Sequence, residues 1–265
     1  MPAIQVSFVI IEFHCPELVR ECVQTIRGHA ANLVHEITVS SNSEYDEPQK
    51  MTITRAFPGV KWLFNAKNGG FAYAMNRGLE ACSGEAAVLV NPDARFIGPI
   101  MPALGYLLTH EEVAILGPQI IDKAGNIQDS CRRFMTPLTL FSRLLKRFFL
   151  RKDVLLAGYF DYNRIQPVDW VIGACMMLRK PYIDQAGLLD EKYFFYVEDM
   201  DICFRAWCSG RQVHYIPEWK VEYKGSRKST VFFIKKNLIN HMSLIHLRSY
   251  LRFLFKYSFY FYRRF

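Results

Sequence analysis

Two acidic stretches carry the side chains of this sequence that are best suited to chemistry. The first, Asn91-Pro92-Asp93, directly follows the apolar run Val88–Val90. Proline cannot continue a strand ladder, so Pro92 ends this run and fixes the direction of the Asp93 carboxylate. A Mg²⁺ or Mn²⁺ ion that carries a diphosphate needs only one or two protein carboxylates. Asp93 is therefore a candidate metal ligand; the alternative is an Asx-type turn in which it bonds only to nearby backbone.

The second acidic stretch reads Glu-Asp-Met-Asp at residues 198–201 and follows an aromatic run at residues 194–196. An aromatic surrounding raises the pKa of a carboxylate, which makes that group useful as a general base. The alternative is structural. Acids in the first turn of a helix complement its dipole, and Asp201 with Arg205 forms an i,i+4 pair of the kind common on helix surfaces.

A third stretch, Val168–Cys175, places Gly173 and Ala174 between residues typical of strands. Small residues at such a point indicate a bulge where a ligand approaches the backbone. Close packing without a ligand is the alternative.

Alternating strands and helices must position these stretches. Runs typical of strands occur at Val6–Ile11, Glu36–Val39, Val60–Phe64 and Ala86–Val90, with helical spacing at Leu18–Ile26 and Phe71–Cys82. This alternation predicts βαβ units, in an α/β fold whose mostly parallel sheet is flanked by helices. Ligands of such sheets collect outside the carboxyl ends of the strands, which is where Asp93 falls.

The second half predicts further elements of both kinds. The expected strands are Val168–Val171, Met176–Arg179 and Gln212–Ile216, and the expected helices are Pro181–Ala186 and Glu198–Ser209, the latter ended by Gly210. The region beyond Lys224 is aromatic, basic and helical in pattern.

Cysteine usage and hydropathy predict the compartment. The seven cysteines are scattered and form no CxxC pair, so we expect reduced cytosolic thiols rather than disulfides or a zinc site. The N-terminal stretch lacks the basic region and cleavage site of a signal peptide, and no run of 18 uncharged apolar residues predicts a spanning helix.

The net charge of +8 is concentrated in two basic segments. Ten Lys or Arg and no acid lie between Tyr223 and Phe265, and seven more, again with no acid, lie between Cys131 and Lys152. The rest of the chain has 16 basic and 25 acidic residues, so it is acidic. This separation indicates a polyanionic surface as partner.

Both basic segments have helical periodicity. Basic residues recur every four positions among aromatic and aliphatic ones: Arg143, Arg147 and Arg151 within Leu138–Lys152, and Arg248, Arg252 and Lys256 in the tail. This pattern is typical of helices that lie in a membrane interface, where each basic residue near an anionic leaflet contributes about 1 kcal/mol. The alternative is a core-packing helix with one solvated face. Nucleic acid is not expected as a partner, because no groove-reading or base-stacking motif accompanies the charge.

The chain resembles the family 2 glycosyltransferases of the GT-A fold, especially their bacterial rhamnosyltransferase-like branch. The stretches that carry the resemblance occur in the family's order: VSFVII, NGGFAYAMNRGL, VLVNPDA, VDWVIGACMMLRK, GLLDEKYFFYVEDMDICFRAW and GRQVHYIPE. They cover about residues 4–225. The resemblance implies a catalytic GT-A domain at residues 1–225, with a basic amphipathic insertion at 131–152 and a basic helical tail at 226–265.

The resemblance also implies an activity. It is the inverting, metal-dependent transfer of a sugar from a nucleotide-diphosphate donor to a hydroxyl of a lipid-linked or polysaccharide acceptor in bacterial surface glycan synthesis, such as O-antigen. The branch suggests dTDP-rhamnose as donor, and a UDP- or GDP-sugar is the alternative. The expected location is the cytoplasm, peripheral on the inner face of the cell membrane. A second hypothesis is a catalytically silent homologue that acts as a sugar-nucleotide- or membrane-binding partner subunit.

By position, the resemblance assigns roles to individual residues. Asp93 resembles the metal-binding acid, Asp199 resembles the catalytic base, and Glu198 holds the loop or assists acceptor binding. Donor-binding positions are Glu12, Ser41, Asn42, Asn68, Gly69, Gly70, Asn91 and Asp93. The wall for the transferred sugar and the acceptor comprises Trp170, Gly173, Ala174 and Asp201.

The chain departs from the family pattern at three places. Ser41 stands where the family usually carries an Asp that holds the nucleotide, and the first-strand loop reads Glu12-Phe13-His14 instead of a small polar pair with an aromatic. Tyr223 stands near the position where many relatives have a His that serves the metal. We hypothesise that Glu12 supplies the carboxylate that Ser41 lacks.

Overall fold

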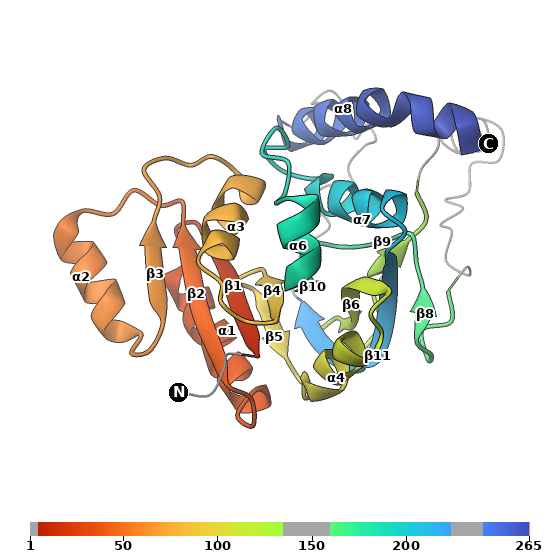
Figure 1. Cartoon of the computed structure of the whole chain (residues 1–265). Helices are drawn as coiled ribbons and strands as arrows, with labels where there is room; N and C mark the ends of the chain where they lie inside the picture. Colours follow the sequence, from red (N-terminus) through yellow and green to blue (C-terminus); the bar gives the residue numbers. More distant parts are fainter. Residues whose placement is uncertain (1–4, 135–159, 224–240, 265) are drawn as a thin grey trace.

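The computed structural model describes residues 5–134, 160–223 and 241–264. A nine-stranded sheet forms its centre, in the order β3-β2-β1-β4-β10-β6-β11-β5, with β8 paired to β11 (Figure 1). Its strands are β1 (Val6–Glu12), β2 (His35–Ser41), β3 (Lys61–Phe64), β4 (Ala86–Val90), β5 (Ala94–Phe96), β6 (Val113–Ile121), β8 (Gln166–Pro167), β10 (Cys175–Arg179) and β11 (Gln212–Tyr223). A separate pair is formed by β7 (Cys131–Arg132) and β9 (Trp170–Val171).

The sheet is mixed but mostly parallel, as the sequence predicts. Strand β1 runs parallel to β2 and β4, β2 parallel to β3, and β6 parallel to β11, whereas β10 is antiparallel to both of its neighbours. The parallel half therefore brings the ends of β1, β2, β3 and β4 to one edge. Predicted donor-binding residues lie at these ends or within four residues of them: Glu12, Ser41, Asn42, Asn68 and Asn91.

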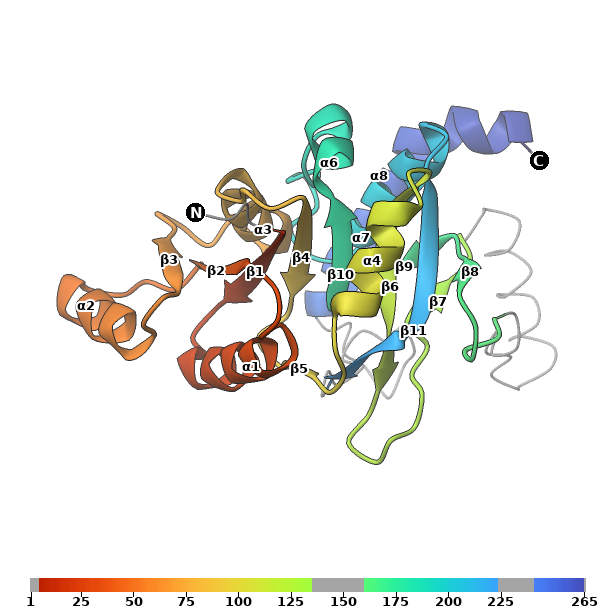
Figure 2. The same ribbon diagram turned by 60° about the horizontal axis from the view of Figure 1, so that its bottom comes forward.

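Helices cover both faces of the sheet, and each face has its own apolar core. On one face lie α1 (Pro16–His29) and α4 (Met101–Thr109), and on the other lie α3 (Phe71–Glu80), α6 (Lys180–Ala186) and α7 (Glu198–Cys208) (Figure 2). The alternation of strand side chains explains both cores, since Phe8 and Ile10 of β1 face α1 while Val9 faces α3. The remaining early helix, α2 (Glu47–Ala56), buries no residue and packs beside β3.

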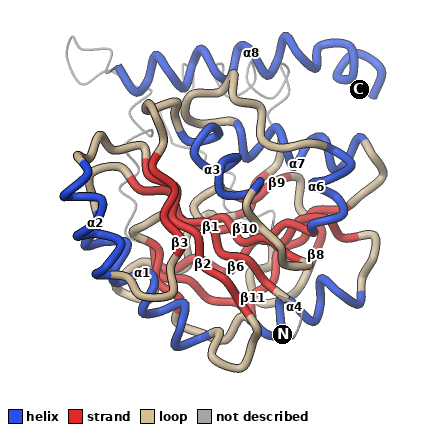
Figure 3. The backbone as a smooth tube through the Cα atoms, turned by 60° about the vertical axis from the view of Figure 1, so that its left-hand side comes forward, coloured by secondary structure: helices blue, strands red, loops and turns tan. Residues whose placement is uncertain are grey.

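The C-terminal helix α8 (His241–Arg264) crosses one end of the molecule above α7 (Figures 1 and 3). Its buried residues Tyr250, Phe253 and Tyr257 belong to the same core as α3 and α7. The rings of Phe253 and Tyr257 lie 5.4 and 4.3 Å from that of Phe204 on α7. The described part of the tail is thus packed on α7, and the other predicted amphipathic segment, Leu138–Lys152, lies outside the described residues.

Among the residues that the structure describes, none of the helices has the length and apolarity needed to cross a membrane. All seven cysteines are free thiols.

Candidate active site

The Glu12 carboxylate is the centre of a closed network at the ends of β1 and β2. The two strands pair Glu12 with Ser41, and Glu12 is fully buried. Its Oε2 accepts from the hydroxyls of Ser41 at 2.5 Å and Ser43 at 2.9 Å, while Oε1 accepts from Tyr45 at 3.0 Å and from the Cys15 N–H at 2.7 Å. Glu12 therefore does place a carboxylate beside Ser41, but it uses its acceptors to orient neighbouring hydroxyls.

A chain of side-chain amides continues this edge of the sheet. The side-chain amide of Asn65 donates to Asn42 Oδ1 at 2.9 Å. The side-chain amide of Asn42 in turn donates to Gly70 O at 3.0 Å and to Asn68 Oδ1 at 3.2 Å. The same Asn68 oxygen accepts the Gly70 N–H at 3.1 Å. Asn42, directly after β2, and the loop before α3 thus form one hydrogen-bonded network, in which Asn42 and Gly70 are buried and Asn68 is exposed.

Gly70 brings this hydrogen-bonded network against the loop that leads to α7. The Phe71 N–H donates to Phe194 O at 2.8 Å, so the two loops are bonded through their backbones. Gly70 has φ of +91°, and a Cβ built there would lie 2.1 Å from Phe194 O. Only glycine satisfies both the left-handed conformation and this close approach. A Cβ at Gly69 would lie 2.4 Å from the Tyr73 ring, so that site is crowded too.

Asn91 and Tyr223 hold the turn that carries Asp93. The Asn91 N–H donates to Ala174 O at 2.8 Å, and its side-chain amide donates to the Tyr223 hydroxyl at 3.0 Å. Tyr223 on β11 lies opposite Ala94 on β5, immediately after Asp93. Burial and the nearby Asp93 charge raise the pKa of Tyr223 to about 12, so its phenol stays protonated. Asp93 is half-buried, and its charge acts on the protonated Tyr223 phenol.

The turn that delivers the second acidic stretch is strained. Tyr196 and Val197 adopt consecutive left-handed conformations, with φ of 67° and 80°. Such a conformation is unfavourable for a β-branched residue and costs about 1–3 kcal/mol. Neighbouring contacts hold the turn in place: Phe71 bonds Phe194, and the Ser249 hydroxyl of α8 donates to Phe195 O at 3.1 Å.

Asp199 follows this turn and is held by two backbone N–H groups. Gly173 donates to its Oδ2 and Met200 donates to its Oδ1, both at 2.8 Å. A Cβ at Gly173 would lie 3.2 Å from the Asp199 Cβ, so the small residue allows this approach. Burial raises the pKa of the Asp199 carboxyl, while the two N–H bonds and the charge of Arg132 oppose the rise. A fixed carboxylate of raised pKa is suited to accept a proton from a bound hydroxyl.

Glu198 differs from Asp199 in its surroundings. It is 5% exposed, and its Oε2 is a buried atom without a hydrogen-bond partner among the described residues. Burial first, and then the Asp199 charge, raises the pKa of the Glu198 carboxyl well above its usual value. Burial thus favours the protonated form of Glu198, whereas two N–H donors favour the ionised form of Asp199.

Asp201 lies away from this pair, in the contact between α7 and α8. It is fully buried, and its oxygens accept from Tyr193 at 3.3 Å, Tyr257 at 2.9 Å, Lys256 at 2.8 Å and Arg205 at 3.0 Å. The i,i+4 pair with Arg205 is present, but it is buried on the Asp201 side. The structure therefore does not bring Asp201 together with Trp170, Gly173 and Ala174.

Trp170 lies beside Gly173 and Ala174, and the sequence reasoning missed its partner Arg132. The β7–β9 pair sets Arg132 opposite Trp170, and the guanidinium carbon lies 5.2 Å from the centre of that ring. Arg132 was predicted only as part of the basic insertion, yet its charge acts on Asp199. Ser43 and Tyr45 were missed as well, and their place two and four residues after Ser41 was the available signal.

The arrangement of sheet, helices and site loops is that of a GT-A glycosyltransferase. Solved structures with the same fold include GalNAc-T7 with UDP, GalNAc and Mn²⁺ (TM-score 0.67, 14% identity, covering 98% of this chain and 50% of that one). They also include the mannosyltransferase PcManGT of Pyrobaculum calidifontis with GDP-Man and Mn²⁺ (TM-score 0.57, 13% identity, 86% and 59% covered). TarS of S. aureus with UDP is a third (TM-score 0.54, 13% identity, 84% and 61% covered).

The sequence itself places the chain in a family. The profile described as "Glycosyltransferase like family 2" matches residues 2–238, so this chain belongs to the family 2 glycosyltransferases. It spans less than two thirds of the length of the first relatives that it matches. The N-acetylglucosaminyl-diphospho-decaprenol L-rhamnosyltransferase of Mycobacterium tuberculosis is 26% identical over 201 residues, which are 70% of this chain and 65% of that protein. The low-salt glycan biosynthesis hexosyltransferase Agl10 of Haloferax volcanii is 24% identical over 206 residues, 76% and 61% of the two chains. Rhamnosyltransferase WbbL of Escherichia coli is 32% identical over a shorter stretch of 68 residues, 26% of each chain.

Proposed function

We propose that this enzyme transfers a sugar, with rhamnose as first choice, from a nucleotide-diphosphate donor to a hydroxyl of a lipid-linked glycan in bacterial surface polysaccharide synthesis. The observation that carries the proposal is the Asp199 carboxylate, fixed by the backbone N–H groups of Gly173 and Met200 next to the buried Glu198 carboxyl. The names of the relatives from M. tuberculosis and E. coli support rhamnosyl transfer, and the former also supports a lipid-diphosphate acceptor.

In the proposed reaction, Asp199 removes the proton of the acceptor hydroxyl as its oxygen attacks the anomeric carbon of the donor sugar. The bond between that carbon and the diphosphate oxygen breaks, and the nucleoside diphosphate leaves with the electron pair. A single displacement of this kind inverts the anomeric centre. Gly173 and Ala174, with the indole of Trp170, form the wall against which the sugar and acceptor are oriented.

Asp93 is the residue that we propose for a divalent cation, Mg²⁺ or Mn²⁺. The described residues contain no group of three or more His, Cys, Asp or Glu side chains that would hold a metal alone. One carboxylate suffices if diphosphate oxygens supply the other ligands, and a carboxylate oxygen is the type of ligand that a hard cation prefers. When bound, the cation would neutralise charge that develops on the leaving group. The protonated Tyr223 phenol is a weak ligand, so we expect metal binding to depend on the donor.

The nucleotide is proposed to bind at the edge of the sheet that carries Ser41, Asn42, Asn68, Gly69 and Gly70. Glu12 acts there by fixing the hydroxyls of Ser41 and Ser43 rather than by direct contact. We favour dTDP-rhamnose, and UDP- or GDP-sugars are the alternatives. The lipid-linked acceptor supports a cytoplasmic enzyme that works peripherally at the inner face of the cell membrane.

A thermal-shift panel of dTDP-rhamnose, UDP-sugars and GDP-sugars, each with and without Mn²⁺, tests the proposal. We expect one donor to raise the unfolding midpoint and to do so only with metal, and a flat panel would contradict the assignment. A second measurement distinguishes an active transferase from a catalytically silent homologue that binds the sugar nucleotide. The silent homologue would show the same shift but no nucleoside diphosphate release in the presence of acceptor.

A further inference from the structure

Helix α8 has two apolar faces, and the residues that the structure describes cover only one of them. Tyr250, Phe253 and Tyr257 are 7%, 0% and 7% exposed and pack towards α7. On the opposite side, Leu244, Leu247, Leu251 and Phe255 are 49%, 37%, 55% and 88% exposed. Their spacing of three or four residues places these four side chains on one stripe of the helix, which we call the outer stripe.

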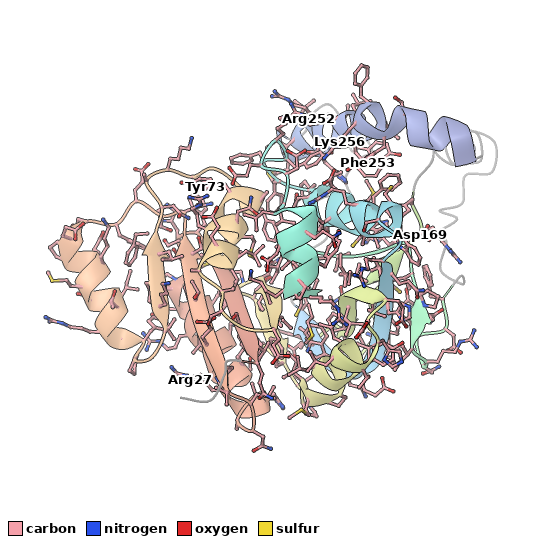
Figure 4. All side chains as sticks on the ribbon, viewed as in Figure 1. Arg27, Tyr73, Asp169, Arg252, Phe253 and Lys256 are labelled. Atoms are coloured by element: carbon pink, nitrogen blue, oxygen red, sulfur yellow. The ribbon has the colours of Figure 1, made fainter. Side chains whose placement is uncertain are left out.

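Basic residues flank the outer stripe. Arg248 and Arg252 are exposed and stand one turn apart, and no acid occurs between Tyr223 and the end of the chain. Lys256 continues the row but turns inward, where its Nζ lies 2.8 Å from carboxylate oxygens of both Asp190 and Asp201 (Figure 4). The sequence could not separate this inward lysine from the two arginines that remain at the surface.

A hollow of about 500 Å³ lies at the edge of the stripe, lined by Asp190, Lys192, Leu251, Arg252, Phe255 and Lys256. Lys256 neutralises Asp190, so Lys192 and Arg252 leave the hollow cationic. Arg252 donates one N–H to Lys192 O at 2.7 Å, and a guanidinium has five such donors. Cations beside exposed apolar side chains match the headgroup phosphate and acyl chains of an anionic lipid.

We propose that the outer stripe of α8 docks on an anionic lipid bilayer, with the stripe among the acyl chains and a headgroup phosphate at Lys192 and Arg252. A second copy of this chain is a poor occupant, because a two-fold contact would bring two basic flanks together. The inference deepens the proposed function, on which it rests for the presence of a lipid-linked acceptor in the same bilayer.

The inner side of α8 explains what such docking achieves. Ser249 bonds Phe195, and the His246 ring lies 4.8 Å from that of Tyr196, so α8 touches the turn that delivers Asp199. A helix with its side chains is about 10–12 Å across. Docking through the outer stripe therefore holds the turn before Asp199 about one helix diameter from the lipid surface. The hydroxyl of a membrane-bound acceptor can reach Asp199 at that distance.

Vesicle flotation of the full chain tests the docking. We expect binding to vesicles that contain phosphatidylglycerol, weaker binding at high salt, and little binding to pure phosphatidylcholine. Removing two exposed apolar anchors in the Leu251→Ser/Phe255→Ser double variant lowers partitioning about a hundredfold. Arg248→Gln lowers it about fivefold. Met51→Ser, at a residue of α2 that is 52% exposed, is the matched control and leaves partitioning unchanged.

A second variant reports insertion without loss of an anchor. Fluorescence of the Phe255→Trp protein is quenched by brominated phosphatidylglycerol, whereas that of Met51→Trp is not. The proposal is overturned if the wild-type chain does not float with anionic vesicles, if the double variant floats like wild type, or if light scattering shows a dimer that the double variant dissociates. Sugar transfer is measured separately on a soluble acceptor. A chain that floats but transfers nothing refutes the proposed function alone, and one that transfers but does not float refutes the docking alone.

Discussion

Asp199 and Asp201 stand two residues apart on α7, and we predict opposite consequences when each is replaced by asparagine. Successive residues of a helix are rotated by about 100°, so residues two apart point to different sides. Asp199 bonds Gly173 next to the proposed sugar wall, and Asp201 bonds residues of α8. Asp199→Asn therefore removes the proposed base, whereas Asp201→Asn weakens the packing of α8.

The expected magnitudes follow from the bonds of each carboxylate. In Asp199→Asn one of two backbone N–H groups loses its acceptor, at a cost of about 0.5–1.5 kcal/mol. Loss of a carboxylate whose pKa is raised by burial offsets that cost, so the free energy of unfolding changes by less than about 1 kcal/mol. Loss of a general base lowers the transfer rate by about 10²–10⁴-fold.

Asp201→Asn affects stability instead. An amide has one acceptor oxygen, and its NH₂ group would face either the Arg205 donor or the Lys256 and Tyr257 donors. Breaking a buried charge pair costs about 3–5 kcal/mol, but the partners are 20% and 33% exposed. We therefore expect a loss of about 2–3 kcal/mol. Tyr257→Phe removes one donor alone and is expected to cost less.

Urea unfolding followed by circular dichroism measures stability, and release of nucleoside diphosphate with acceptor present measures transfer. Donor binding, followed by calorimetry, should survive in both variants. The reasoning is refuted if Asp201→Asn is as stable as wild type yet inactive, because Asp201 would then act in the site. It is also refuted if Asp199→Asn retains more than about a tenth of the wild-type rate, which is more than loss of a general base permits.

Three further variants test the geometry of the site. Gly70→Ala adds a clash with a backbone oxygen to the strain of a left-handed residue, so it should prevent folding or lower the free energy of unfolding in urea by several kcal/mol. Gly210 has φ of +77° but open space around it, so Gly210→Ala should lower that free energy by only about 1 kcal/mol. Gly173→Ala displaces Asp199 by a few tenths of an ångström, so it should lower kcat about tenfold with little change in the thermal unfolding midpoint. An unchanged kcat would show that the close contact between Gly173 and Asp199 is not needed for transfer. Because burial raises the Glu198 pKa on folding, the contribution of this residue to stability falls as pH rises above about 4. Glu198→Gln should therefore match wild type at low pH and exceed it at pH 8, and equal pH profiles in urea unfolding would contradict this.

Local signals predicted much of the parallel half of the sheet. Strand β4 has the predicted bounds Ala86–Val90, because an unbroken apolar run ends at Asn91-Pro92. Strand β6 was missed, since Gly117-Pro118 interrupts its pattern although all but its last residue are buried. Helix α2 was missed for the opposite reason: it buries no residue and so has no apolar stripe, although its capping box at Asp46 and Gln49 was a usable signal.

Contacts between distant segments could not be predicted from one sequence. The resemblance singled out Gly70 and Asp199, but no local pattern shows that Gly70 touches Phe194 or that Gly173 bonds Asp199. The contacts of Asp201 could not be predicted either, because its place in the first turn of the helix grouped it with Glu198 and Asp199. Its partners Tyr257 and Lys256 come from a helix more than fifty residues further along the chain.

The role of α8 decides how membrane contact is best tested. Cutting the chain before α8 would remove the outer stripe, but it would also uncover the core at Phe204 and leave Asp201 and Arg205 without Lys256 and Tyr257. A truncated protein that fails to bind vesicles would therefore say little, because its base turn would also have lost the Ser249 contact. Changes confined to the outer stripe avoid this ambiguity, since its side chains point away from α7. One rigid helix thus joins the lipid-facing residues to the turn before Asp199, so docking and catalytic geometry can be separated only by surface variants.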